Sequence, residues 1–200
     1  MKKQKLLAIF FLLIFILNAY LAFYEGAPEV ILWFCVNIMI LFIIGLWFDN
    51  ILLLSATVTS YLVIGSIWTI DLVSFLITGN APLNIVRYLE TASNIRFVVT
   101  FYHILLLVAP LAILMKKKMI HKYAWIVSSI HLSIMSILTL IITTSNISCL
   151  RAPCEIPIIS LLYLLKPAFI PLVLFNLIVL TLLVFIPTNY IMAYLLRKKN

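Results

Sequence analysis

The sequence predicts an all-α fold, a bundle of about six transmembrane helices that forms a single domain over residues 1–200. Two observations lead to this prediction. Apolar residues make up 66% of the chain and charged residues only 10%, whereas a soluble domain is about half apolar and a quarter charged. Several apolar runs are also longer than the roughly 18 residues that indicate a membrane-spanning helix.

Turn-forming and polar residues divide the apolar chain into its expected helices. Gly26 and Pro28 break the chain after the first helix, residues 48–50 follow the second, and a more polar stretch, 79–96, follows the third. We expect the first helix to be retained, because no clear small-x-small cleavage site follows it. The expected spans are residues 5–23, 29–47, 51–77, 97–115, 123–142 and 168–195.

The apolar stretch at residues 158–196 does not divide as simply. It is too long for one span and too short for two spans with a loop, and Pro167, Pro171 and Pro187 interrupt it. We therefore expect a re-entrant or interfacial stretch up to Lys166, followed by the sixth span.

The basic residues predict the orientation of the bundle. Ten of the fourteen Lys and Arg residues lie in three clusters, within 2–5, 116–122 and 197–199, which fall on one side of a chain that crosses six times. The other side has four: Arg87, Arg96, Arg151 and Lys166. Because Lys and Arg concentrate in cytoplasmic loops, we expect a cell-membrane protein with both termini in the cytoplasm. The clusters adjoin the spans, so the net charge of +8 indicates contact with membrane lipid and not with nucleic acid.

Three reactive side chains are expected to share one depth in the membrane. Cys35, Asp71 and His103 lie in the second, third and fourth spans. At about 1.5 Å of rise per residue, each lies about 10 Å below the outer end of its span. An ionisable side chain inside a span is costly and marks a candidate functional site. We therefore expect an outer-leaflet site whose substrate-binding neighbours are Trp68, Asn37 and Asn146.

These residue types permit nucleophilic acyl transfer. Cys35 would be the nucleophile, His103 the base that takes its proton, and Asp71 the group that orients the imidazole. Each residue also has a structural interpretation. A free Cys often packs as a small apolar residue, a single His often makes an interhelical hydrogen bond, and an Asp71–His103 pair can hold two helices together. The residues alone leave both interpretations open.

Other kinds of site receive less support. Cys149 and Cys154, in an expected outer loop, fit a structural disulfide, free or metal-bound thiols, or a redox pair. His103 and His131 are expected to differ in depth by roughly 10 Å, which is too far for the two ligands of one haem. The chain has no phosphate-binding glycine loop and no zinc-ligand spacing, so neither a cofactor nor a metal is predicted.

Four short motifs carry a resemblance to known membrane proteins. They are Trp-Phe-Cys-Val-Asn at 33–37, Trp-Thr-Ile-Asp at 68–71, Phe-Tyr-His at 101–103 and Asn-Ile at 146–147. In this order they resemble a group of bacterial and archaeal polytopic membrane proteins without an assigned function. More distantly, they are similar to the YwaF-type membrane proteins, the androgen-induced fatty-ester hydrolases and a related membrane acyltransferase. The resemblance implies Cys35 as the nucleophile and His103 as its base.

Two hypotheses about function follow. The first is a lipid-active enzyme, an acyl hydrolase or acyltransferase, that uses Cys35, His103 and Asp71. The second is a non-enzymatic membrane protein, such as a carrier, a small-molecule binder or a scaffold subunit, in which Asp71 and His103 form a structural pair.

Overall fold

The computed structural model describes residues 2–90, 92–144 and 171–197, and these ranges contain helices and turns but no strand. Five of the described helices are long and apolar enough to cross a membrane. They are α1 (Lys2–Tyr24), α3 (Ile51–Thr78), α4 (Asn94–Thr100) continued by α5 (Tyr102–Lys117), α6 (Ala124–Ile142), and α8 (Leu172–Val179) continued by η4 (Leu180–Phe185) and α9 (Ile186–Arg197). The prediction of an all-α, multi-pass membrane protein is thus confirmed.

One expected span differs from the prediction. The span expected at 29–47 is interrupted, because a short 3-10 turn, η1 (Pro28–Leu32), precedes a shorter apolar helix, α2 (Phe34–Trp47). The polar stretch at 79–96 is largely irregular in its described part, which contains η2 (Arg87–Glu90) and the start of α4. The re-entrant stretch expected up to Lys166 lies outside the described residues.

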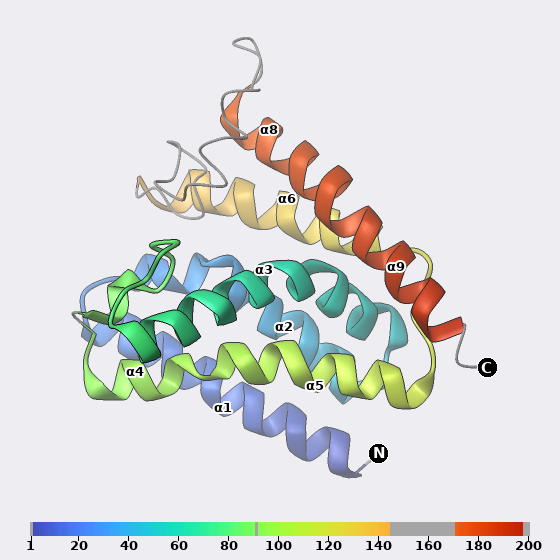
Figure 1. Ribbon diagram of the computed structural model, residues 1–200, viewed down its shortest axis with the longest axis horizontal. Coiled ribbons are helices and arrows are strands. Elements are labelled where there is room, and N and C mark those ends of the chain that lie inside the picture. Colours follow the sequence, from blue (N-terminus) through green and yellow to red (C-terminus); the bar gives the residue numbers. More distant parts are fainter. Residues whose placement is uncertain (1, 91, 145–170, 198–200) are drawn as a thin grey trace.

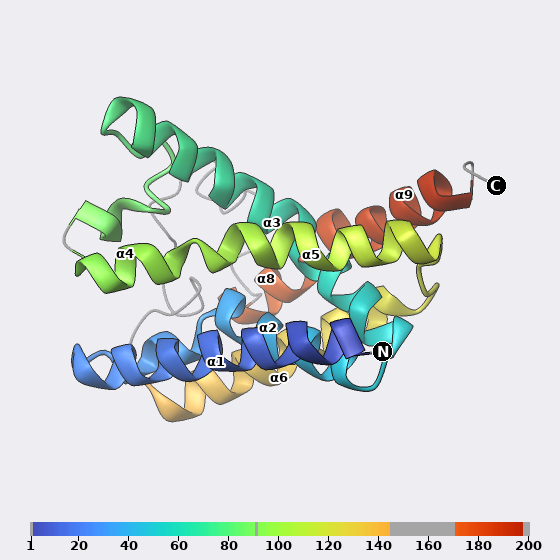
Figure 2. The ribbon, with the colours of Figure 1, turned by 90° about the horizontal axis from the view of Figure 1, so that it is seen from below.

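Helix α3 lies at the centre of the bundle. It packs against α2, α5, α6 and α9, and α1 joins the bundle by packing against α2 (Figure 1). Both termini lie at the same end of the bundle, close to the turn between α5 and α6 (Figures 1 and 2). The apolar core draws on α1, α2, α3, α5 and α9, and its fully buried members include Phe11, Phe42, Tyr61 and Leu106.

Helix α6 shows that the bundle is built for lipid. Its exposed face is a stripe of isoleucines at helical spacing, whereas its buried face carries hydroxyl groups. The Ser128 hydroxyl donates hydrogen bonds to the carbonyl oxygens of Ala56, on α3, and Ala124. Small hydroxyl residues between helices and aliphatic residues outside are typical of helix packing in membranes. The exposed stripe consists of Ile130, Ile134, Ile137 and Ile141.

A proline explains the π-helical segment η4 in the C-terminal helix. Pro187 has no N–H to donate, and in a regular α-helix its ring would clash with the carbonyl of Leu183, four residues earlier. The helix widens into a π-helical turn over Leu180–Phe185, next to this proline. Such a turn lets the helix continue past the proline instead of ending there.

The end of the bundle that holds the termini is fastened by a carboxylate in the α2–α3 turn. The Asp49 carboxylate pairs with the Lys117 ammonium, at the end of α5, and accepts a hydrogen bond of 3.1 Å from the Gln4 side chain. Asp49 has a left-handed backbone with φ of 51°, which Asp and Asn tolerate better than most residues. One turn residue therefore links three helices.

We expect this contact to make the stability of the protein depend on pH. The hydrogen bond from Lys117 is the main cause that holds the pKa of Asp49 below its ordinary value of 3.8. The stabilisation is therefore present above that value and is lost as the pH falls through the lower pKa of the folded protein. Melting curves in detergent between about pH 3 and pH 7 should show the wild type slightly above Asp49→Asn near neutrality and equal to it in acid. A difference that persists in acid would contradict this origin.

Candidate functional site

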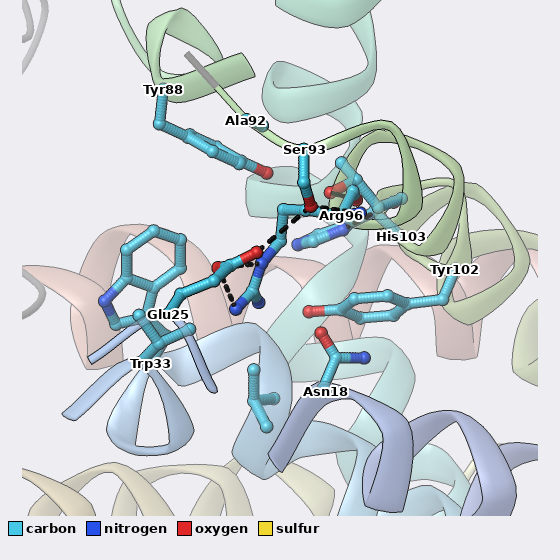
Figure 3. Close-up of a pocket in the computed structure, with 12 residues that line it drawn as sticks. Asn18, Glu25, Trp33, Tyr88, Ala92, Ser93, Arg96, Tyr102 and His103 are labelled. Atoms are coloured by element: carbon cyan, nitrogen blue, oxygen red, sulfur yellow. Dashed lines mark hydrogen bonds and ion pairs between the residues drawn. The ribbon is translucent and has the colours of Figure 1, made fainter. Parts of the chain in front are cut away.

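A cavity of about 450 Å³ is drawn in close-up in Figure 3. The segments that line it, around the end of α1 and the start of α4, lie at the end of the bundle opposite the termini (Figure 2). Pockets of roughly 300–1,000 Å³ are typical of small-molecule sites. The end of α1, the η1–α2 segment, the loop before α4, and the α4–α5 junction all contribute to its wall. The described lining residues are Asn18, Glu25, Val30, Trp33, Val36, Tyr88, Ala92, Ser93, Arg96, Thr100, Tyr102 and His103.

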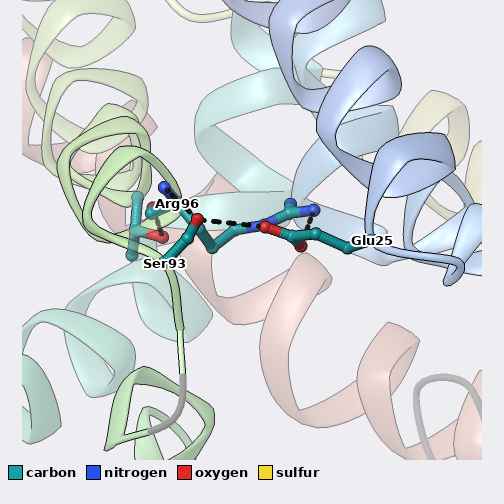
Figure 4. A network of polar contacts seen from close by, with 4 residues as sticks. Glu25, Ser93 and Arg96 are labelled. Atoms are coloured by element: carbon teal, nitrogen blue, oxygen red, sulfur yellow. Dashed lines mark hydrogen bonds and ion pairs between the residues drawn. The ribbon is translucent and has the colours of Figure 1, made fainter.

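An ion pair between the buried Arg96 and the partly exposed Glu25 lies in this cavity (Figures 3 and 4). Arg96 donates from Nε and Nη2 to Oε2 of Glu25, at 2.9 and 2.7 Å, and the Ser93 hydroxyl donates to Oε1 of Glu25 at 3.1 Å. The Arg96 side chain is 10% exposed, whereas that of Glu25 is 32% exposed. Glu25 follows α1 and Arg96 lies in the first turn of α4, so the pair joins two segments far apart in the sequence.

The interruption before α2 forms one wall of the cavity. Irregular backbone inside a membrane is tolerated where it lines a cavity or is buried in protein, because its polar groups need partners. Asn37 supplies them: its side-chain amide donates to the carbonyl oxygens of Ile31 and Trp33, at 2.8 and 3.1 Å. Asn37, predicted to bind substrate, does not line the cavity but bonds the backbone of Trp33, which does.

A second interruption, between α4 and α5, positions His103. The helix breaks at Phe101, and the His103 Nδ1 lies 2.8 Å from the carbonyl oxygen of Thr100. Because a carbonyl only accepts, Nδ1 must carry the hydrogen, which leaves Nε2 of the neutral ring as an acceptor. His103 therefore supports the helix break with one nitrogen while its side chain contributes to the cavity wall.

Aromatic side chains pack around the site. The rings of Trp68 and His103 stack with centroids 4.0 Å apart, and Trp33 meets Tyr88 edge to face at 5.5 Å. Trp68, predicted to bind substrate, is buried behind His103 and does not line the cavity. Burial raises the pKa of Tyr88, which lies in η2, to about 12, so its phenol is neutral at physiological pH.

The contacts of Asp71 differ from those that the sequence suggested. Its fully buried carboxylate accepts hydrogen bonds from the backbone amides of Leu83, Ile85 and Val86, at 2.8, 2.9 and 3.0 Å. These bonds fold the loop that follows α3 back onto that helix. Within the described part of the chain, Asp71 bonds loop amides and His103 bonds Thr100, so the expected Asp71–His103 contact is not formed.

Among the described residues, no hydrogen bond joins Cys35 to His103, as a nucleophile and its base would require. The Tyr102 hydroxyl donates to Sγ of Cys35 at 3.4 Å, and Cys35 does not line the cavity, whereas Tyr102 and His103 do. A thiol needs a nearby base or cation to become a strong nucleophile. The catalytic roles of Cys35, His103 and Asp71 stay predictions without a contact that supports them.

Three of the predicted residues, Asn146, Cys149 and Cys154, lie outside the described ranges. Two residues that line the cavity, Glu25 and Arg96, were not predicted, because the sequence marks them only as charges beside two spans. Among the described residues, no group of three His, Cys, Asp or Glu side chains is arranged to hold a metal ion.

No protein-family model, curated protein or solved structure matches this chain in the three comparisons with known proteins.

Proposed function

We propose that the chain is a six-span membrane protein with both termini in the cytoplasm, and that its cavity lies toward the outer leaflet. α2 alone would extend about 21 Å, less than the roughly 30 Å hydrocarbon core, but η1 and α2 together are long enough to cross. Lysines at the start of α1 and at the end of α5 share the end of the bundle that holds the termini. That asymmetry supports the cytoplasmic assignment.

The cavity supports a function in binding a small amphiphilic molecule. The observation that carries this proposal is the cavity of about 450 Å³, whose wall combines the Arg96–Glu25 ion pair with the apolar side chains of Val30, Trp33 and Val36. Polar groups among apolar walls suit a ligand with a polar head and an apolar tail. Such a ligand can enter from the membrane, where amphiphiles already lie.

The contacts favour a binder over an acyl-transfer enzyme. The thiol of Cys35 has the Tyr102 hydroxyl as its partner, and Asp71 is used by the loop after α3. A catalytic triad needs the base to reach the nucleophile and the carboxylate to reach the base. Neither contact is formed among the described residues, whereas the cavity is already present in this structure.

Filling the cavity with a larger side chain should weaken ligand binding. We expect purified protein to retain monoolein, an uncharged amphiphile, and Ala92→Trp to lose at least about tenfold in affinity, because the indole occupies space in the cavity. Ala92 lies in a loop but packs against the apolar cluster that contains Trp68 and Leu72, so the melting temperature of Ala92→Trp is measured beside its affinity. Native mass spectrometry of protein released from detergent measures the bound fraction.

The controls separate binding from folding and from catalysis. Ile137→Trp, on the exposed face of α6, should leave retention unchanged. Equal retention by wild type and Ala92→Trp would contradict binding in this cavity. Release of oleate from monoolein by wild type, with no release by Cys35→Ala, would instead support the enzyme hypothesis.

A further inference from the structure

The ion pair in the cavity identifies the charge of the ligand. We infer that the ligand carries an anionic oxygen group, a carboxylate or a phosphate, which replaces Glu25 as the partner of Arg96. This inference rests on the proposed function, because it assigns a ligand class to the same cavity. Glu25 then acts as the counter-ion of Arg96 while the cavity is empty.

Burial decides which member of the pair can be replaced. The Arg96 side chain is 10% exposed and that of Glu25 is 32% exposed. A buried charge without a partner is strongly destabilising, so Arg96 must always keep a counter-ion. A carboxylate that already reaches solvent loses much less when it is released. An arriving anion can therefore take the place of Glu25, whereas an arriving cation would have to strand Arg96.

The hydrogen bonds around Arg96 also favour an anionic ligand. Both Glu25 oxygens already accept bonds, from Arg96 and Ser93. The Arg96 guanidinium uses Nε and Nη2 for Glu25, and among the described residues no acceptor bonds its Nη1. A planar guanidinium binds carboxylate or phosphate oxygens through two parallel N–H groups. The cavity thus offers unused donors to a ligand that brings acceptors.

The backbone beside Glu25 gives the carboxylate room to move. Gly26 has a left-handed conformation with φ of 72°, and a Cβ placed on it would meet no atom within 4 Å. Glycine adopts such a conformation without steric cost and moves between backbone regions more freely than other residues. The turn that carries Glu25 therefore borders open space, into which the displaced carboxylate can swing.

Three ligands with one acyl chain test the inference: oleate, oleoyl lysophosphatidic acid, and uncharged monoolein. We expect wild type to bind the anionic ligands more tightly than monoolein. In Glu25→Gln no carboxylate competes for Arg96, so the protein does not have to release Glu25 before it binds an anion. We therefore expect this variant to bind the anionic ligands about tenfold more tightly than the wild type. Arg96→Gln should lose at least about thirtyfold for the anions, because a buried charge contact is lost. Monoolein binding should change little in either variant.

Ser93→Ala is a second variant that loosens Glu25 but keeps both charges. It removes the hydrogen bond to Glu25 and also the N-cap bond that Ser93 accepts from the Arg96 amide, so its melting temperature is measured together with its affinity. In folded protein it should tighten anion binding about threefold, which corresponds to the modest worth of the bond to Glu25. The relative affinities of oleate and the lysophosphatidic acid distinguish a carboxylate ligand from a phosphate ligand. Competition by inorganic phosphate alone would indicate a free anion as the source.

The outcomes separate this inference from the proposed function. If monoolein and the anions bind equally to wild type, and Glu25→Gln and Ser93→Ala change nothing, the cavity binds amphiphiles but the anionic assignment is wrong. If Glu25→Gln weakens anion binding in protein that melts like the wild type, Glu25 is a ligand-binding group and not a replaceable counter-ion. If none of the three ligands binds, both the proposed function and this inference are wrong.

Discussion

Asp71→Asn is expected to lower the free energy of unfolding by about 3 kcal/mol, because a buried carboxylate that accepts several hydrogen bonds is replaced by a group that is half donor. Asp71 accepts from three loop amides, two of them at Oδ2. In the variant, the amide nitrogen must face at least one backbone N–H that also donates. The loop after α3 would then lose its attachment to that helix.

Thermal unfolding in detergent measures this effect. The matched control is Asp49→Asn, at the other end of the bundle. The side chain of Asp49 is 45% exposed, so this substitution should lower the free energy of unfolding only slightly. Limited proteolysis adds a local readout, because cleavage between Gly79 and Ser93 should become faster in Asp71→Asn. If both variants melt like the wild type, the carboxylate does not hold the loop.

Gly65→Ala is expected to cost about 1–2 kcal/mol, even though alanine favours a helix more than glycine does. A Cβ on Gly65 would lie 2.5 Å from Cε1 of Tyr61, one turn earlier in α3. The Tyr61 ring is fully buried in the core of the bundle, so it has no open space to enter. Either the ring or the helix must shift, and packing around Tyr61 is lost.

A double-mutant cycle isolates this contact. In the Tyr61→Ala background, Gly65→Ala should be neutral or stabilising, because the ring is absent and only the helix preference of alanine remains. Melting temperatures of the wild type, both single variants and the double variant in one detergent give the coupling. Ser66→Ala, which removes only a hydrogen bond to Leu62, serves as the control. Equal destabilisation by Gly65→Ala in both backgrounds would show that Tyr61 is not the cause.

Helix positions followed from the sequence where the signal was local. The expected spans at 5–23, 51–77 and 123–142 agree with α1, α3 and α6 within a few residues, because the length of an apolar run is read directly from the chain. The interruptions were not predictable in the same way. The break at Phe101 lies between Thr100 and Tyr102, where neither glycine nor proline marks it, while Pro110, a residue that often bends helices, lies inside α5.

The candidate site was predicted in part. The sequence selected His103, which does line the cavity, because an intramembrane His is rare and costly. It also selected Asp71, which the fold uses for the loop that contains Leu83. It did not select Glu25 and Arg96, since charges beside a span are ordinary in membrane proteins and mark no partner.

The sequence by itself determined the membrane setting, the helical class and the grouping of lysines near span ends, because these depend on composition and on residues close together in the chain. Only the tertiary structure decided which polar groups meet. Arg96 pairs with Glu25 across 71 positions and Tyr102 bonds Cys35 across 67. The physical reason is that a polar group buried in a lipid-facing bundle is costly without a partner, and helix packing decides which partner is near.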